Sequence, residues 1–578
     1  MTLFIPYIGW QSTKYFKVLI IYLGCISVLY SLICIIDLEF YKELGTHLNI
    51  LAIQPNTRSK ELWTFMWDEY PIIYYLIFIF IIMLIWIKIL LKFISYKFDQ
   101  ATSSAKQIIF FVISFLLTGI FARGGLQERP IDWGHAMFSN NQFANQLALN
   151  PLFNFGRSVV QLNSEKNISK IIHFMDDKTA LDISKKMILA PNEKFIDSLS
   201  FKRKIISPKS IEPNIVFIIL ESFLGNYCGF INNNNYDITP NLNKIAKEGI
   251  NFSKTIASGK RSAFGLGSIL CSWPVLPGLP LISSLESQKN IDTIGSLLKK
   301  INYSTYFLFG GDADFDNMKG FVKSNGFDKV IERDDFPSNT PGTMWGVFDE
   351  YLFSYAQNIL DTTSNPTLIT LFTITNHQPW IIPADKEKII PQYKNQKTNS
   401  DILRTVTYTD YVIGQFIDQN KNKEWFNNTI FVFVADHGVN EFSAMYEDPR
   451  NAHIPFLIYS PDLISEPFIS NQITSQVDIV PTLLHIIGYP KEFNLMGSNI
   501  LREGYNGFAC RIINDYGMWL DSEFLFTEVF NQYSKVFKYT DFYQIPYLEL
   551  ANNGEIFNQI QTNFHAYIQS AYIINKKR

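Results

Sequence analysis

Two apolar runs after residue 210 end in residues that can bind a metal ion. The run NIVFIIL at 214–220 leads into Glu221, and TIFVFVA at 429–435 leads into Asp436 and His437. Carboxylates and imidazoles are ligands for Mg²⁺, Mn²⁺ or Zn²⁺. Either group could instead be a helix cap or a loop charge, although turn chemistry explains Asp436 and not His437. Together the two segments would bring a carboxylate and a carboxylate–imidazole pair, a candidate set of metal ligands, to the same edge of a sheet.

A Gly/Ser-rich segment supplies a candidate nucleophile. It reads SGKRSAFGLG at 258–267, with Ser262 at its centre and Ser258 as the alternative hydroxyl. A serine hydroxyl is a weak nucleophile unless a base or a metal activates it. Lys260 and Arg261 carry charges that can neutralise a phosphate. Taken alone the segment is an ordinary small-residue loop, and the two acidic strand ends give it weight.

Alternating strands and helices are predicted to position these residues. Short β-branched and aromatic runs cover 214–220, 303–309, 367–374, 429–435 and 454–459, with helical patterns at 239–248 and 291–300 between them. Such alternation favours an α/β domain with a mostly parallel sheet covered by helices on both faces. Ligands bind at the carboxyl ends of the strands in these sheets. Glu221, Asp436 and His437 all follow a strand directly and are therefore expected at one edge.

Three apolar runs near the N-terminus are predicted to span a membrane. They cover 16–36, 72–91 and 108–122, of which the third is the shortest. A spanning helix needs about 20 mostly apolar residues, so a buried hairpin of core helices is the weaker alternative. Lysines precede the first run and flank the loop between the second and third, whereas the segment from 37 to 69 is acidic. Because basic flanks stay in the cytoplasm, residues after 122 are expected outside it.

Composition and length indicate how the chain divides into domains and which partners are not expected. The 578 residues are expected to divide into a membrane anchor (1–122), a connector with amphipathic helices (123–209), a catalytic domain (210–500) and its C-terminal extension (501–578). A net charge of −3 gives no reason to expect a nucleic-acid partner. The five cysteines have no metal-type spacing, and a Cys228–Cys271 bond is possible but not established.

Seven segments, taken in order, resemble the alkaline phosphatase superfamily, and most closely its lipoteichoic acid synthase-like phosphoglycerol transferases. The segments are NIVFIILES, SGKRSAFG, FLFGGDADFDNM, TNHQPW, VADHG, AHIPFLIYSP and VDIVPTLL. In that family a glutamate, a hydroxyl nucleophile and an Asp–His pair bind one divalent cation, usually manganese or magnesium. The matching positions here are Glu221, Ser262, Asp436 and His437, and zinc is a further candidate metal.

The resemblance also implies residues that contact the substrate. His377 in TNHQPW matches a substrate-contacting histidine, which is expected to bind a phosphate oxygen or to protonate a leaving group. Further candidates for substrate binding are Lys260, Arg261, Asp312, Asn317 and His453. For His453, a neutral core histidine is an equally good interpretation.

The implied reaction is a ping-pong transfer at the outer face of the cell membrane. Ser262 would attack the phosphorus of a phospholipid donor, phosphatidylglycerol first among the candidates, releasing diacylglycerol and forming a phosphoglyceryl-serine. A glycan, lipid or polymer in the cell envelope would then accept the group. The expected protein is thus a multi-pass membrane phosphotransferase with a periplasmic (extracytoplasmic) catalytic domain.

Some features depart from the family and leave alternatives open. Many relatives have threonine at the position of Ser262, and lipoteichoic acid synthases carry a Trp and an Arg where 315–318 reads FDNM. Three spans rather than five suggest a shortened or incomplete N-terminal region. A phosphoethanolamine transferase, a phosphodiesterase or phosphatase, and a non-catalytic scaffold with the same fold are the rival interpretations. A sulfatase is disfavoured, since no x-Pro-x-Arg follows Ser262.

Overall fold

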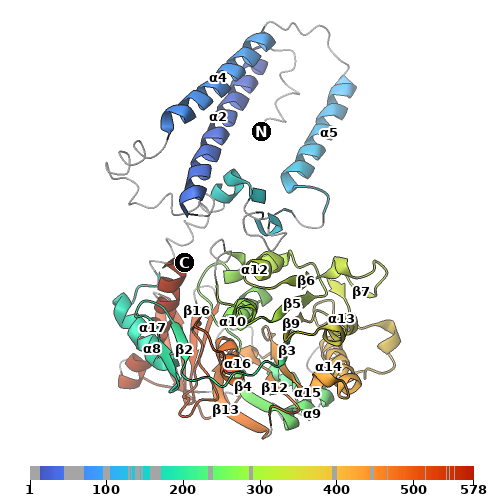
Figure 1. The fold of residues 1–578 in the computed structure, drawn as a ribbon, viewed down its shortest axis with the longest axis vertical. Coiled ribbons are helices and arrows are strands. Elements are labelled where there is room, and N and C mark those ends of the chain that lie inside the picture. The colour runs from blue at the N-terminus through green and yellow to red at the C-terminus, as the bar shows by residue number, and fades with distance from the viewer. Residues whose placement is uncertain are drawn as a thin grey trace. The chain divides into compact units, whose positions relative to one another are not determined.

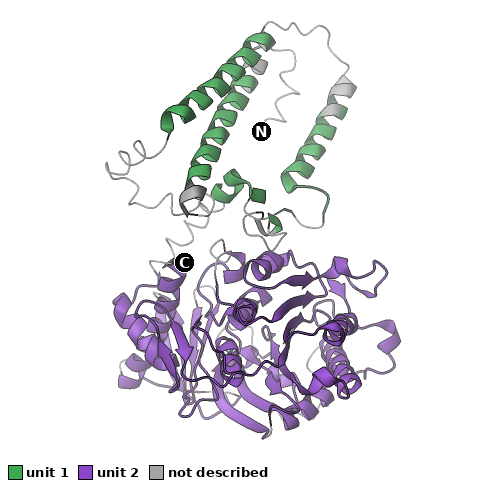
Figure 2. Ribbon diagram, in the orientation of Figure 1, with its two compact units in different colours: residues 1–165 green, residues 166–578 purple. Residues whose placement is uncertain are grey.

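A computed structural model of the chain (Figure 1) resolves into two compact units, residues 1–165 and 166–578 (Figure 2). The structure describes residues 13–44, 71–94, 104–127, parts of 130–156, and 171–577 apart from 232–237, 285–290, 394–399, 440, 443–447, 465, 514–515, 531, 542, 546 and 552–553.

Three apolar helices dominate the first unit. They are α2 (Thr13–Leu44), α4 (Ile72–Ile94) and α5 (Ser104–Arg123), and α2 packs against α4. Within the described residues, the stretches Ile20–Glu39 and Ile72–Lys92 are long and apolar enough to cross a membrane. The third predicted span forms most of α5, whose apolar part, Phe111–Arg123, is shorter. Membrane crossing by α5 therefore remains a prediction.

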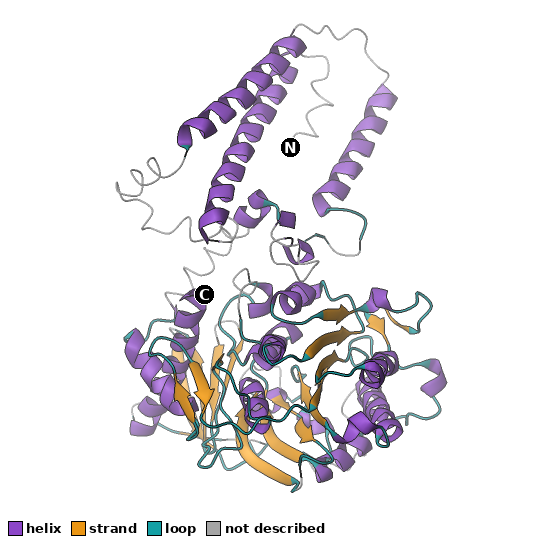
Figure 3. Cartoon of the chain, viewed as in Figure 1, coloured by secondary structure: helices purple, strands orange, loops and turns teal. Residues whose placement is uncertain are grey.

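The second unit is built on a nine-stranded mixed sheet (Figure 3). Five strands are parallel: β10 (Thr429–Ala435), β3 (Asn214–Leu220), β9 (Thr367–Phe372), β5 (Ser304–Phe309) and β6 (Lys329–Ile331). Beyond β10 the sheet continues antiparallel through β12 (Phe456–Tyr459), β4 (Ile250–Ile256) and β11 (His453–Ile454), and β13 (Phe468–Ser475) pairs parallel with β4. The predicted α/β class is confirmed, and the antiparallel half is an addition to it.

The two central strands are buried on both faces. Every residue of β3 and of β10 is buried, as their β-branched and aromatic composition predicted. They pair in parallel from Asn214 beside Thr429 to Leu220 beside Ala435. The residues that follow, Glu221 and Asp436, therefore leave the sheet at the same level of adjacent strands.

Two groups of helices cover this sheet (Figure 1). On one face lie α10 (Ser262–Cys271), α11 (Ile294–Lys299) and α16 (Ile479–Ile486), which contact one another through α10. On the other lie α9 (Pro240–Glu248), α13 (Asp349–Thr362) and α14 (Ser400–Asn420), which contact one another through α14. Helices on both faces were predicted, and they seal the apolar strands from water.

The C-terminal segment adds a five-stranded antiparallel sheet and a helix. The strands are β15 (Ala509–Ile513), β16 (Tyr516–Leu520), β17 (Phe524–Val529), β18 (Tyr533–Lys538) and β19 (Leu548–Glu549), followed by α17 (Glu555–Lys577). β15 lies against β13 and β4 of the main sheet.

Part of the predicted connector belongs to the second unit. Helix α8 (Asp177–Ile188) packs on α17, where Ser184 and Ser570 hydrogen bond at 2.9 Å. The strands β1 (Glu193–Phe195) and β2 (Lys202–Ile205) form a small sheet with β14 (Phe493–Asn494). Earlier in the predicted connector, residues 151–156 lie within the described part of the chain and are helical. None of the five cysteines forms a disulfide, so no Cys228–Cys271 bond is present.

Candidate active site

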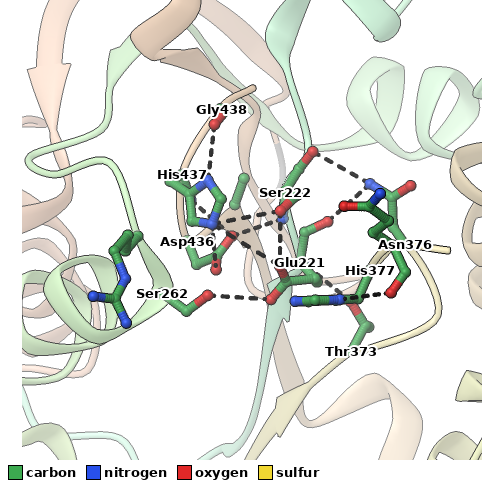
Figure 4. A network of polar contacts seen from close by, with 12 residues as sticks. Glu221, Ser222, Ser262, Thr373, Asn376, His377, Asp436, His437 and Gly438 are labelled. Atoms are coloured by element: carbon green, nitrogen blue, oxygen red, sulfur yellow. Dashed lines mark hydrogen bonds and ion pairs between the residues drawn. The ribbon is translucent and has the colours of Figure 1, made fainter. Parts of the chain in front are cut away.

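Glu221, Asp436 and His437 meet at the carboxyl ends of β3 and β10 (Figure 4). One ligand atom from each lies within 4.8 Å of the others, and both carboxylates are buried. The parallel register of the two strands brings them together, because each residue follows the last strand position directly. The sequence-based expectation that these three side chains share one edge agrees with this geometry.

A hydrogen-bond network fixes the two carboxylates. The Ser222 amide donates to Asp436 Oδ1 at 2.8 Å, and the Ser222 hydroxyl donates to Glu221 Oε1 at 2.7 Å. The His437 amide also donates to Asp436 Oδ1, at 2.7 Å. Ser222 adopts the left-handed backbone region, with φ of 54°, which turns its amide toward Asp436. Asp436 Oδ1 is thus saturated by two amides.

The remaining oxygen of Asp436 faces the histidine ring and leaves room for a cation. Among the described residues, the buried Oδ2 of Asp436 has no hydrogen-bond partner. His437 Nδ1 lies 2.8 Å from the carbonyl of Gly438, an acceptor, so Nδ1 carries the hydrogen and Nε2 presents a lone pair. That Nε2 lies 3.5 Å from Asp436 Oδ2 and 3.9 Å from Glu221 Oε1. Three electron-rich atoms converging at this distance fit a divalent cation between them.

The pKa of Glu221 reflects its burial beside the second carboxylate, that of Asp436. Burial raises the pKa of this carboxyl well above its ordinary value, and the nearby Asp436 charge raises it further. Two carboxylates held together out of water repel each other unless a positive charge lies between them. The electrostatics therefore agree with the donor set in favouring a bound cation.

Ser262 lies beside this cluster as the first residue of α10. Its hydroxyl donates to Glu221 Oε2 at 3.4 Å (Figure 4). The helix can come this close because residue 265 is glycine: a Cβ there would lie 2.1 Å from the backbone oxygen of Asp436. A hydroxyl at a helix N-terminus also lies where the helix dipole favours negative charge, which suits a phosphate oxygen.

Ser258, the alternative nucleophile, lies elsewhere. It is fully buried, its amide donates to Gln476 Oε1 at 2.9 Å, and its hydroxyl is 3.3 Å from that of Ser475. The Gln476 amide group in turn donates to the carbonyls of Ala435 and Asp436, at 2.8 and 2.7 Å. Ser258 thus helps to hold the end of β10, and Ser262 is the serine of this loop that contacts Glu221.

The loop after β9 brings His377 to the same region (Figure 4). Asn376 precedes it and donates to the carbonyls of Glu221 and Ser222, at 3.0 and 3.2 Å, which ties this loop to the end of β3. The imidazole of His377 is half-buried and lies against the indole of Trp345, with ring centroids 4.1 Å apart. Its role toward substrate remains a prediction.

Of the remaining substrate-binding candidates, Arg261 is the most exposed. Its guanidinium pairs with Asp316 at 3.0 Å while its side chain remains 60% exposed, and Lys260 beside it is half-buried. Asp312 accepts from the Asp314 amide at 2.9 Å, and Asn317, which is buried, donates to the carbonyl of Ile282 at 2.6 Å. The contacts described for Asp312 and Asn317 stabilise loops rather than face the carboxylates.

His453 has the surroundings of a core histidine. Its Nδ1 lies 2.7 Å from the Tyr543 hydroxyl and its Nε2 lies 2.8 Å from the carbonyl of Ser253. Burial lowers the pKa of His453 to about 4, so the ring is neutral near pH 7. With both nitrogens engaged inside the protein, the structure does not bring His453 to the carboxylate cluster.

Sequence reasoning missed the residues that support the cluster. The carboxylates and the strand ends are held by Ser222, Gln476 and Asn376. The hydroxyl oxygen of Thr373 also accepts a hydrogen bond from the Glu221 amide, at 2.9 Å. Ser222 and Asn376 sit inside segments already singled out, next to Glu221 and His377. No local pattern marks Gln476, whose role depends on a contact 40 residues away in sequence, with Asp436.

Comparison with known proteins agrees with the fold. A solved alkaline phosphatase superfamily protein from Vibrio parahaemolyticus superimposes with a TM-score of 0.63 at 26% identity, covering 70% of this chain and 97% of that one. A lipoteichoic acid synthase from Listeria monocytogenes shares the fold, with a TM-score of 0.57 at 19% identity over 70% of this chain and 98% of its own. The mixed sheet with its cluster at the strand ends is thus an alkaline phosphatase superfamily fold.

Sequence comparison identifies a family model and relatives that match parts of this chain. Residues 213–489 match the family model described as Sulfatase, so the chain contains a sulfatase-family domain. A lipoteichoic acid synthase-like protein of Bacillus subtilis (strain 168) is 27% identical over 318 residues, which are 50% of each chain. Phosphoglycerol transferase I of Xanthomonas axonopodis pv. citri is 25% identical over 271 residues, 43% of this chain and 37% of its own. The chain spans about half the length or less of these two relatives.

Proposed function

We propose that this chain transfers a phosphoglycerol group from a membrane phospholipid to an acceptor outside the cytoplasm through a covalent phospho-Ser262. The observation that carries the proposal is the placement of Ser262. Its hydroxyl contacts Glu221 Oε2 at a helix N-terminus, within the cluster that also contains Asp436 and His437. Relatives named lipoteichoic acid synthase and phosphoglycerol transferase support this reaction class.

Each residue of the site is assigned one part of the proposed transfer reaction. Ser262 Oγ forms a bond to phosphorus as the bond from phosphorus to the diacylglycerol oxygen breaks. The diacylglycerol oxygen gains a proton in exchange for the one that Ser262 loses, and His377 is the expected donor. In the second half, an acceptor hydroxyl bonds to phosphorus and the serine oxygen leaves with a proton. Arg261, exposed beside Ser262, is the expected contact for a phosphate oxygen.

One divalent cation, manganese or magnesium, would be held by Glu221, Asp436, His437 and Ser262. When bound it would lower the pKa of the serine hydroxyl and neutralise phosphate charge. The free Oδ2 of Asp436 and the lone pair of His437 Nε2 support this assignment. Zinc is compatible with the same donors.

The proposed location outside the cytoplasm depends on how many helices cross the membrane. Two helices, α2 and α4, have the required length and composition, and crossing by α5 as well would put the second unit on the side opposite the N-terminus. If only α2 and α4 cross the membrane, the second unit lies on the same side as the N-terminus. Accessibility of a single added cysteine in 166–578 to a membrane-impermeant thiol reagent, in intact cells, separates the two arrangements.

The cysteines of the second unit favour phosphatidylglycerol over phosphatidylethanolamine as the proposed donor. Phosphoethanolamine transferases are expected to carry several disulfides in the soluble domain, whereas Cys228, Cys271 and Cys510 are buried and form none. Phosphatidylglycerol is therefore the first donor to test, and phosphatidylethanolamine the second. Water as the acceptor would make the protein a phosphodiesterase.

The test is head-group release by the full chain in detergent. The parent with Mn²⁺ and fluorescent phosphatidylglycerol should release labelled diacylglycerol, Ser262→Ala should not, and Ser258→Ala should retain the activity. Trapping of radiolabelled glycerol phosphate on the parent and not on Ser262→Ala would demonstrate the intermediate. Equal release by the parent and Ser262→Ala would refute Ser262 as the nucleophile, and no release from either phospholipid would refute the proposed reaction.

A further inference from the structure

Trp345 lies against the imidazole ring of His377. The two ring centroids are 4.1 Å apart and the planes are tilted by 45°. Phe315 packs edge-on against the same indole, with centroids 6.2 Å apart and an angle of 66°. The three rings come from three separate segments, and Trp345 and His377 are both half-buried. Trp345 thus lies between the FDNM segment and the candidate substrate histidine.

The backbone around Trp345 is fixed to the end of β5. Trp345 belongs to a hairpin of β7 (Gly342–Thr343) and β8 (Gly346–Val347), and its amide donates to the Thr343 hydroxyl at 3.1 Å. Gly346 bridges Gly311, just beyond β5, and a Cβ on Gly346 would lie 2.3 Å from the Gly310 oxygen. Since β5 pairs with β9, the hairpin is anchored next to the loop that carries His377.

A buried carboxylate ties the two segments together. Asp349, four residues after Trp345, is fully buried and accepts from the amides of Ile374 and Thr375, at 2.9 and 3.1 Å. The Thr409 hydroxyl donates to its other oxygen at 2.8 Å, and the Asp349 amide donates to the Thr375 hydroxyl at 3.0 Å. These bonds hold the start of the His377 loop at a set distance from the Trp345 hairpin.

The imidazole itself has little else to orient it. Among the described residues, its hydrogen-bond contact is between Nδ1 and the carbonyl of Gln378, the next residue, at 3.0 Å. A bond to an adjacent carbonyl moves with the loop and restricts the ring only locally. The face of the ring is therefore restrained by the indole.

We propose that Trp345 is a positioning residue, which holds the imidazole of His377 in the orientation needed to reach the phosphate or the leaving oxygen. The catalytic consequence rests on the proposed function, whereas the ring contact does not. The family motifs quoted above do not include Trp345, and the hairpin that carries it reaches the site only through the packing of Gly310, Gly311 and Gly346.

Kinetics of five variants test whether Trp345 acts through His377. Trp345→Leu should lower kcat for diacylglycerol release by about 10- to 100-fold, as for a group displaced by about 1 Å, whereas Trp345→Phe should retain most of it. In the His377→Gln background, Trp345→Leu should have no further effect, because the residue it positions is gone. Trp425→Leu is the matched control, since Trp425 is half-buried, donates to Asp361 at 2.8 Å and should leave kcat unchanged. Equal loss in Leu and Phe variants, or additive loss with His377→Gln, would overturn the proposal.

Fluorescence tests the contact independently of the reaction. A protonated imidazole in contact with an indole quenches its emission, so at mildly acidic pH His377→Gln should raise tryptophan emission above that of the parent. The increase should be absent when Trp345 is already phenylalanine, and present when Trp425 is leucine. An increase that survives Trp345→Phe, or no increase at all, would overturn the ring contact. If the fluorescence behaves as expected while the parent releases no diacylglycerol, the proposed reaction is wrong and the aromatic contact stands.

Discussion

Substituting Gly265 by alanine should separate Ser262 from the cluster of Glu221, Asp436 and His437. A Cβ at residue 265 would lie 2.1 Å from the Asp436 backbone oxygen, and an ordinary contact begins at 3.4 Å. Helix α10 and the end of β10 must therefore separate by about 1.3 Å, the difference between those two distances. Overpacking of this kind costs about 1–3 kcal/mol of stability. The Ser262 hydroxyl, already 3.4 Å from Glu221 Oε2, would move out of hydrogen-bond range.

The expected result of Gly265→Ala is a large loss of activity with the fold retained. A displacement of about 1 Å lowers kcat by roughly 100-fold when reacting groups lose alignment. Helix propensity works in the other direction, since alanine favours a helix interior over glycine by about 1 kcal/mol. A loss of rate could not then be attributed to a weaker α10. Release of diacylglycerol and thermal unfolding, both in detergent, measure the two quantities.

Gly267→Ala provides the control on the same helix. A Cβ there would meet Leu281 at 3.6 Å, an ordinary contact, so both activity and melting temperature should stay near those of the parent. Full activity of Gly265→Ala, or equal losses at both positions, would show that the close approach at Asp436 does not set the position of Ser262.

Three further perturbations test the cluster and the packing around it. Burial, and then the Asp436 charge, raise the pKa of Glu221, which shows that its ionised form is unfavourable in the protein without metal. Glu221→Gln should therefore raise the melting temperature of the EDTA-treated protein. It should also abolish the rise in melting temperature that Mn²⁺ causes in the parent, with both quantities measured by scanning fluorimetry. Gln476→Leu removes three hydrogen bonds, two to the carbonyls of Ala435 and Asp436 and one from the Ser258 amide. It should lower the free energy of unfolding by about 3 kcal/mol in urea titrations. An unchanged free energy of unfolding would argue against a stabilising role for Gln476. Glu193→Gln leaves the fully buried Arg203 without its ion pair and should cost about 3–5 kcal/mol at pH 7. Burial raises the pKa of Glu193, but Arg203 and His485 together lower it to about 2 from 4.5, so this stabilisation is complete above about pH 4.5 and is lost as the pH falls toward 2. The difference between the parent and Glu193→Gln should shrink in urea titrations at pH 3, and a constant difference would contradict the assignment.

Local composition was enough to predict the central strands and the apolar helices. The runs at 214–220 and 429–435 became β3 and β10 with the same bounds, because a continuous run of β-branched and aromatic residues is stable only when both faces are covered. The apolar content of α2 and α4 likewise depends on each segment alone. The metal-binding candidates followed, since Glu221, Asp436 and His437 adjoin these strands in sequence.

Strand direction and element breaks were not available from composition. The run at 454–459 was predicted as one strand, and the structure divides it into β11 and β12 around Pro455, which has no amide hydrogen to donate. The pairing of β12 with β10 is antiparallel, which apolar content does not specify. The association of α8, β1 and β2 with the second unit depends on partners near the opposite end of the chain, such as α17 and β14.

The sequence by itself determined the residue types of the candidate site and the strands that end at it. The tertiary structure alone decided which serine contacts Glu221, and it placed Ser258 in the interior and His453 among core contacts. It also brought Trp345 to His377 through a glycine hairpin and the buried Asp349. The physical reason is that these contacts join segments far apart in the chain. Their geometry is set by close backbone approach at Gly265 and Gly346, and by buried hydrogen bonds, neither of which a local pattern encodes.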